Sequence, residues 1–124
     1  MGGNQQDELA QEIVNRWTET HKKSMLTLLI LVGLKEKPMW SKELQDWLNE
    51  LTGWDLTERG LHRTLQRMAK IDLIEYQTAN SPKSGADRKV YNITDFGREI
   101  ASDIRKNSLM YLDGAEYLQR LKNI

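Results

Sequence analysis

The chain has 124 residues, of which 39% are hydrophobic and 29% are charged, and its 18 basic residues balance its 18 acidic ones. This composition is typical of one globular domain with a modest core, and it argues against a strongly basic protein that coats nucleic acid. The absence of cysteine excludes disulfides, thiolate metal sites and cysteine nucleophiles, and it fits a reducing cytoplasm.

The first twenty residues are polar and acidic, so we expect no secretory signal there. Leu9, Ile13 and Trp17 are four residues apart and form a narrow apolar stripe on a predicted acidic helix over residues 6–20. Such a stripe is too thin to stabilise a helix alone, so it predicts a docking partner.

Residues 23–36 form a second predicted helix, which is apolar nearly all round and should lie at the centre of the core. Its apolar run, Met25–Leu34, is about half of the roughly 20 residues that a membrane span needs. We therefore expect no membrane association. Lys37-Pro38 should end this helix.

The next helix should begin with Ser41 as its N-cap and end at Gly53, a residue typical of helix C-termini. Trp47 fits the apolar stripe of this helix, and packing in the core or in a dimer is the simplest role for all four tryptophans. Thr57 is the predicted N-cap of the following helix. Gly60, in the first turn of that helix, suggests a close backbone approach to the preceding helix or to a ligand.

Residues 57–70 divide into two chemistries when they are placed on a helix. Leu61, Leu65 and Met68 gather on one side, and the basic side chains gather on the other. Arginine makes forked contacts to phosphates and to guanine edges, so this segment predicts a DNA recognition helix. The same row is also consistent with a helix face that is simply exposed to water. That alternative does not explain the basic side chains of the hairpin that follows. The basic row consists of Arg59, Arg63, Arg67 and Lys70.

The period then changes to that of a strand over residues 73–78, and residues 80–87 form a polar, turn-rich tip. Residues 89–94 alternate polar and apolar side chains, as expected for the returning strand. Residues 57–90 carry seven basic and four acidic side chains, whereas residues 1–21 carry one and four, so the positive charge lies near the predicted reading face.

Thr94 or Asp95 should cap a long final helix, with Glu99 as its capping partner. Apolar positions alternating by four and three form a seam along this helix, which predicts pairing with a second chain. Asp113-Gly114 could instead break the helix into two pieces. The seam positions are Ile100, Ile104, Asn107, Tyr111, Gly114, Leu118 and Leu121.

Three helices, a basic hairpin and a further helix are the element order of a winged helix-turn-helix, a mainly α fold with a small β component. The chain also resembles the PadR-like transcriptional regulators over roughly residues 24–100. The family's Leu-x-x-Leu-x-x-x-Gly-Leu-Ile run corresponds to Leu65–Ile74, where Met68 takes the place of the second leucine, and its more specific Arg-Lys-x-Tyr-x-Ile-Thr-x-x-Gly run appears at Arg88–Gly97. His62 stands where the family usually has tyrosine, and Asp72 replaces a turn glycine. MarR-like regulators and archaeal regulators of the Lrs type share part of the pattern and stay as alternatives.

The resemblance implies a homodimeric repressor that binds a pseudo-palindromic site in double-stranded DNA. We expect residues 1–21 to be an acidic dimer-contact helix, 22–95 the DNA-binding domain and 96–124 a dimerisation helix. The alternatives are a winged helix used for protein–protein contact and a chromatin or architectural protein with little sequence preference. A small-molecule effector is a further candidate partner, with Trp17 and a partner's aromatic residue lining its cavity.

The sequence contains no phosphate-binding loop, zinc-protease motif or nucleophile elbow, so we expect no enzyme activity, cofactor or metal. The predicted dimer contacts are Leu9, Ile13, Trp17, Ile104, Tyr111, Leu118 and Leu121. The residues predicted to face DNA are Lys42 on the helix that begins near Ser41, Thr57, Glu58, Arg59, His62, Arg63, Gln66 and Arg67 at the recognition helix, and Lys83, Ser84, Arg88 and Lys89 in the wing.

Overall fold

The computed structural model describes residues 3–80 and 87–124. The first helix, α1 (Asn4–Glu36), is one continuous element of 33 residues. The two separate helices predicted for residues 6–20 and 23–36 are therefore wrong as separate elements. No proline interrupts this stretch, and its only internal glycine is Gly33 near the end, so nothing in the sequence breaks the helix.

After α1 come β1 (Met39–Trp40), α2 (Ser41–Thr52), α3 (Glu58–Lys70), β2 (Ile74–Asn80) and β3 (Asp87–Ile93). The chain ends with α4 (Asp95–Ser108), the 3₁₀ turn η1 (Met110–Leu112) and α5 (Ala115–Lys122). The three strands form an antiparallel sheet of order β1-β3-β2. This is the predicted winged helix-turn-helix, mainly helical with a small sheet.

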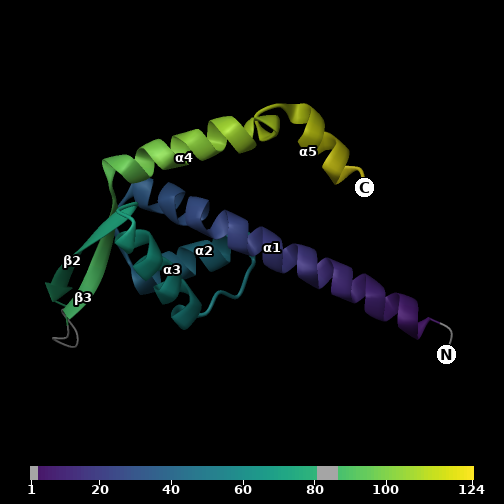
Figure 1. Cartoon of the computed structure of the whole chain (residues 1–124), viewed down its shortest axis with the longest axis horizontal. Helices are drawn as coiled ribbons and strands as arrows, with labels where there is room; N and C mark the ends of the chain where they lie inside the picture. The colour runs from purple at the N-terminus through teal and green to yellow at the C-terminus, as the bar shows by residue number, and fades with distance from the viewer. Residues whose placement is uncertain (1–2, 81–86) are drawn as a thin grey trace.

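Figure 1 shows how these elements are arranged. The N-terminal part of α1 projects away from α2, α3 and the sheet, and α4 and α5 follow one side of α1. The start of α1 and the end of α5 lie at the opposite end of the molecule from the β2–β3 hairpin. No helix in the described part of the chain is long and apolar enough to cross a membrane.

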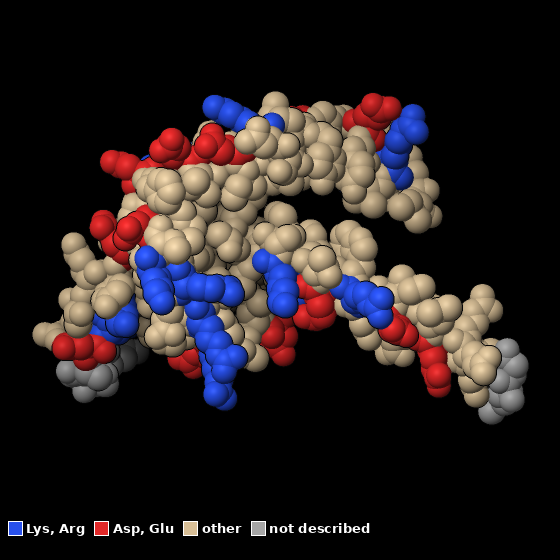
Figure 2. All heavy atoms as spheres, in the orientation of Figure 1, with Lys and Arg blue, Asp and Glu red and all other residues tan. Residues whose placement is uncertain are grey.

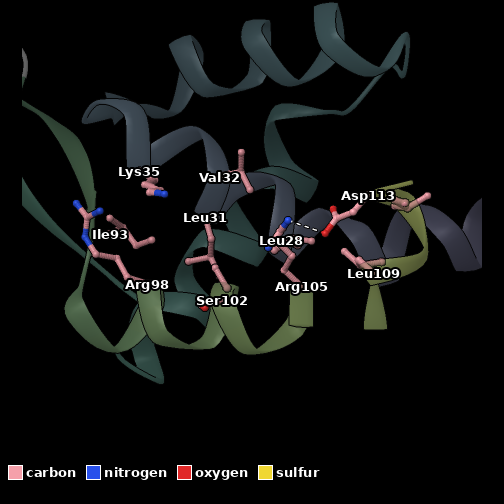
Figure 3. A pocket seen from close by; sticks show the side chains of 12 residues that line it. Leu28, Leu31, Val32, Lys35, Ile93, Arg98, Ser102, Arg105, Leu109 and Asp113 are labelled. Carbon is pink, nitrogen blue, oxygen red and sulfur yellow. Dashed lines mark hydrogen bonds and ion pairs between the residues drawn. The ribbon is translucent and has the colours of Figure 1, made fainter. Parts of the chain in front are cut away.

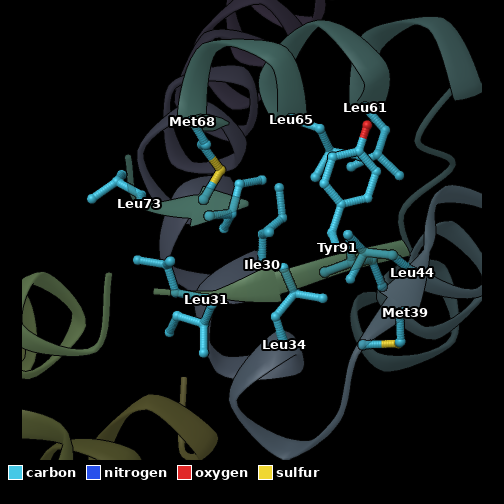
Figure 4. Close-up of a cluster of buried hydrophobic side chains, with 13 residues drawn as sticks. Ile30, Leu31, Leu34, Met39, Leu44, Leu61, Leu65, Met68, Leu73 and Tyr91 are labelled. Atoms are coloured by element: carbon cyan, nitrogen blue, oxygen red, sulfur yellow. The ribbon is translucent and has the colours of Figure 1, made fainter. Parts of the chain in front are cut away.

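The core lies between the C-terminal third of α1, helices α2 and α3, and the sheet (Figure 4). The apolar face of α3 is buried as predicted, with Leu61, Leu65 and Met68 at most 2% exposed. Gly33 lets α1 approach α2 closely, because a Cβ at this position would lie 2.6 Å from the Trp47 ring. Other fully buried members of the core are Ile30, Leu31, Leu44, Leu48 and Ile74.

The predicted helix caps are confirmed at two of three starts. The Thr57 hydroxyl accepts a hydrogen bond from the Gly60 N–H at 3.1 Å, and the Thr94 hydroxyl accepts one from the Gly97 N–H at 2.9 Å. Ser41 is not an N-cap. It is the first residue of α2, and Trp40 occupies the cap position.

Glu43 and Gly53 define the two ends of α2. The Glu43 carboxylate accepts a hydrogen bond from the Trp40 N–H at 3.3 Å and so closes the start of α2. Gly53 is the C-cap of α2 with φ +74°, and this confirms the prediction that a glycine ends the helix here. Glu99 is not the capping partner of α4, because the third helical position is Gly97.

The C-terminal segment is not one long helix, so the continuous seam predicted from Ile100 to Leu121 is wrong. Helix α4 ends at Ser108, and the backbone of Leu109 is no longer helical, with φ −123°. Gly114 is the N-cap of α5 in an extended conformation, which agrees with the alternative of a break at this point. An ion pair of 2.7 Å between Arg105 and Asp113 spans the bend.

The start of α4 is fixed against the turn between α3 and β2. The Thr94 hydroxyl donates to the Asp72 carbonyl oxygen at 2.6 Å, and the Thr94 N–H donates to the Leu73 carbonyl oxygen at 3.2 Å. Gly97 touches this turn so closely that a Cβ would lie 2.1 Å from the Leu73 carbonyl oxygen. Asp72 has φ +64°, a left-handed conformation that glycine adopts without strain, at the position where the resemblance implies a turn glycine.

Candidate nucleic-acid interface

The outer face of α3 presents basic side chains to solvent. Arg59, Arg63 and Arg67 are exposed, opposite the buried apolar face of the same helix. Figure 2 shows basic side chains gathered over this part of the molecule. Within residues 3–80 and 87–124, none of these arginines forms an ion pair. Their charge is therefore available to an anionic partner.

The other predicted residues of α3 lie on or beside this face. His62 and Gln66 are exposed, and Glu58 lies in the exposed first turn. His62 also lines a shallow hollow between the first turns of α2 and α3, together with Ser41, Glu58 and Arg59. The hollow brings polar groups of two helices together at the start of the proposed reading helix.

At Gly60 the close contact is with the Thr57 cap of the same helix and not with the preceding helix. A Cβ at Gly60 would lie 3.0 Å from the Thr57 hydroxyl oxygen, so its missing side chain leaves room for the cap. It makes no close approach to α2. Lys42, on α2, pairs with Asp46 at 3.0 Å, and both side chains are more than half exposed. Such an exposed pair contributes little stability, so Lys42 can exchange Asp46 for a phosphate at small cost.

The β2–β3 hairpin carries two of the predicted wing cations, Arg88 and Lys89, on adjacent positions of β3. The Arg88 guanidinium carbon lies 4.2 Å from the centre of the Trp40 ring, and the Lys89 ammonium lies 4.4 Å from the centre of the Tyr76 ring. Both distances are in the range of cation–π attraction. The predicted tip residues Lys83 and Ser84 lie outside the described residues.

Trp40 and Tyr76 were not among the predicted site residues. The signal that identifies them is the strand register, in which Trp40 pairs with Val90 and Tyr76 pairs with Tyr91. Each ring is thus a diagonal neighbour of its cation across the sheet. This register depends on β1, which has only two residues and leaves no alternating pattern in the sequence.

Tyr91 lies on the same face of β3 as Lys89 and is buried. Burial raises the pKa of the Tyr91 hydroxyl above its ordinary value of 10.0, and the neighbouring Tyr76 raises it further. The two rings lie 5.8 Å apart, centre to centre. This face of β3 therefore changes from the charged Lys89 in the wing to the neutral, buried Tyr91 in the core.

The predicted dimer-contact side chains are mostly exposed in this chain. Leu9, Ile13 and Trp17 are 55%, 59% and 67% exposed, and Val14, which the sequence reading did not select, is 61% exposed. On the C-terminal side, Ile104 is half-buried, whereas Tyr111, Leu118 and Leu121 are exposed. These apolar groups lie along the projecting part of α1 and on α4, η1 and α5.

An aromatic cluster joins the exposed stretch of α1 to the loop before α3. The Trp17 and His21 rings stack with centres 5.1 Å apart, and His21 meets the Trp54 ring edge-on at 5.9 Å. The Trp17 and Trp54 side chains are thus brought together, although the sequence placed them on unrelated elements. Within the described residues, no group of His, Cys, Asp or Glu side chains could hold a metal ion.

A cavity of about 580 Å³ lies between α1, α4 and η1 (Figure 3). Its floor is apolar, and its rim carries Lys35, Arg98 and the Arg105–Asp113 ion pair. The apolar lining residues are Leu28, Leu31, Val32, Ile93, Ala101, Leu109 and Leu112.

Comparison with known proteins adds independent evidence. The family model for the transcriptional regulator PadR-like family matches residues 30–103, which confirms the resemblance inferred from the sequence. The match runs from the end of α1 through α2, α3 and the sheet to Asp103 in α4. No curated protein matches the chain.

Solved structures agree with this match. A PadR-like transcriptional regulator from Bacillus cereus is 28% identical with a TM-score of 0.68, over 81% of this chain and 96% of that one. A PadR family transcriptional regulator from Eggerthella lenta shares the fold with a TM-score of 0.74 at 21% identity, over 90% of this chain and 96% of the other. Bacillus subtilis PadR in complex with operator DNA shares the fold with a TM-score of 0.58 at 20% identity, over 64% of this chain and 44% of that protein.

Proposed function

Because the chain belongs to the PadR-like family of transcriptional regulators, we propose that it is a homodimeric repressor that binds a pseudo-palindromic site in duplex DNA. The observation that carries the proposal is the row of exposed arginines on α3, which have no acidic partner within the described residues. The complex of Bacillus subtilis PadR with operator DNA supports the proposed kind of partner. As regulators, the family and its structural neighbours also agree with the expectation that this chain is not an enzyme.

The proposed DNA contacts follow from the exposed faces. Helix α3 would enter the major groove with its arginines and amide reaching base edges and flanking phosphates. The wing and the start of α2 would contact the backbone. The proposed groove contacts are Thr57, Glu58, Arg59, His62, Arg63, Gln66 and Arg67, and the proposed backbone contacts are Lys42, Lys83, Ser84, Arg88 and Lys89.

The proposed dimer uses both ends of the chain. Residues 1–21 and 96–124 would provide the contacts, and 22–95 would provide DNA binding, although the boundary at residue 21 falls inside the continuous helix α1. The exposed side chains of Ile13, Val14 and Trp17 support this division, because they form an apolar surface on the projecting part of α1. A second copy would cover that surface.

A small-molecule effector stays a proposal of its own. The cavity between α1 and α4 has a volume within the range of ligand-binding pockets, roughly 300–1,000 Å³, and an apolar floor with a few charged rim groups. Because Thr94 at the start of α4 is hydrogen-bonded to the turn that follows α3, a ligand that shifts α4 would also shift the end of the reading helix.

We place the protein in the cytoplasm together with its DNA.

Selection from random duplexes tests this function. The full-length protein should enrich two inverted half-sites whose centres lie one helical turn apart, about 34 Å. Sedimentation of the complex should give two protein chains for each duplex. Retention of duplexes without any enriched sequence would instead favour an architectural protein, and failure to retain duplex DNA at physiological salt would favour a protein–protein module.

A further inference from the structure

The two described wing cations lie on opposite faces of the hairpin. Arg88 and Lys89 are consecutive in β3, and successive side chains of a strand point to opposite faces of the sheet. Arg88 shares its face with Trp40, which β1 supplies, and Lys89 shares the other face with Tyr76 from β2. Each cation therefore has an aromatic ring from a different strand beside it.

These rings hold the cations in place without neutralising them. Arg88 and Lys89 lie 4.2 Å and 4.4 Å from their ring centres, and neither forms an ion pair within residues 3–80 and 87–124. A carboxylate in the same place would compete with phosphate for the charge, whereas a ring covers only one face of a planar guanidinium. Within residues 3–80 and 87–124, no side-chain hydrogen bond occupies the N–H donors of Arg88, so they can reach a phosphate oxygen.

Fixing such side chains in advance favours binding. A free lysine or arginine side chain loses much rotamer freedom when it docks on DNA, and stacking removes part of that loss before binding. Trp40 is itself held by two contacts, namely its pairing with Val90 and the hydrogen bond from its N–H to the Glu43 carboxylate. The position of Arg88 is therefore tied to the first turn of α2, next to the start of α3.

We propose that Trp40 and Tyr76 are positioning residues for DNA binding, which aim Arg88 and Lys89 at the phosphates on the two sides of the wing. This inference rests on the proposed DNA-binding function and adds two uncharged residues to the site. It predicts that the rings affect affinity only through their cations.

The test measures affinity for the selected duplex with Trp40→Leu and Tyr76→Leu, which keep apolar bulk and net charge but remove the ring. Each should weaken binding roughly 5- to 30-fold, because the dimer loses two exposed cation–π contacts, one in each protomer. Trp40→Phe should recover part of the loss. The slope of log affinity against log salt should stay at the wild-type value in these variants, because each keeps the phosphate-binding charge.

A double-mutant cycle separates positioning from a general effect on the fold. In an Arg88→Ala background, Trp40→Leu should cause no further loss, and the same should hold for Tyr76→Leu in a Lys89→Ala background. An equal loss in both backgrounds, or no loss in either ring variant, overturns the inference. Tyr76 is 47% exposed, so its variant should fold even where the Trp40 variant is less stable.

The outcome also distinguishes this inference from the proposed function. If wild-type protein does not bind duplex DNA, the proposed function fails. If wild-type protein binds and Arg63→Gln weakens binding while the ring variants do not, only the role of Trp40 and Tyr76 fails.

Discussion

Replacement of Arg63 and Arg67 by glutamine is the sharpest test of the reading helix. Glutamine keeps much of the side-chain length and a similar helix propensity, so α3 should fold as before. If each arginine neutralises one phosphate in both protomers of the dimer, the slope of log affinity against log salt should become less steep by about 3.6, from roughly 0.9 for each of four contacts. Over a fourfold rise in salt, the wild type should then lose about 150-fold more affinity than the variant. Fluorescence anisotropy with a labelled duplex at several salt concentrations measures both quantities.

A matched control removes the same charge elsewhere. Arg16 and Arg120 are exposed and pair with Glu12 and Glu116 on α1 and α5. The Arg16→Gln, Arg120→Gln variant should keep the wild-type slope, and sedimentation should show that its assembly is unchanged. An Arg63→Gln, Arg67→Gln variant with a wild-type slope would refute the assignment of α3, as would a control variant that loses as much slope as the α3 variant.

Four further outcomes follow from the fold. Gly97→Ala should lower the free energy of unfolding by about 3 kcal/mol in chemical denaturation, because its Cβ would collide with the Leu73 carbonyl; a loss below about 1 kcal/mol would contradict this. Asp72→Gly should raise the free energy of unfolding by up to about 1 kcal/mol, because φ +64° costs glycine nothing. Because burial raises the pKa of folded Tyr91 above the unfolded value of 10.0, its contribution to stability is complete below pH 10 and is lost as pH rises through the folded pKa; Tyr91→Phe should flatten alkaline unfolding curves in that window. Trp17→Glu should shift sedimentation toward the monomer without weakening the α2–α3 core, and an unchanged dimer would exclude this surface from the interface.

The sequence predicted well those features that depend on local periodicity. The two faces of α3 follow from the spacing of Leu61, Leu65 and Met68, and both the buried and the exposed side are as expected. The hairpin and the caps at Thr57 and Thr94 also follow from local chemistry. These features need no knowledge of the rest of the chain.

The features that the sequence missed depend on contacts between distant segments. The stacking of Arg88 on Trp40 requires the register of a two-residue strand, and the stacking of Trp17, His21 and Trp54 requires the position of a loop against α1. The end of α4 is predicted only in part, because Asp113-Gly114 is a candidate break but the helix already ends at Ser108. A seam read along the sequence assumed that one helix continued, whereas the chain leaves helical geometry at Leu109.

The Arg88–Gly97 segment explains why one short motif was informative about both fold and function. Its first two residues are the wing cations, its middle residues enter the core, and Thr94 ties the start of α4 to the turn after α3. Gly97 then fits against the Leu73 carbonyl, where a Cβ has no room. A substitution at the end of the motif should therefore disturb the packing of α4 before it disturbs DNA contact, and a substitution at its start should do the reverse. A chain that keeps Thr94 and Gly97 but lacks the wing cations should retain the fold and lose most of the wing's share of DNA affinity.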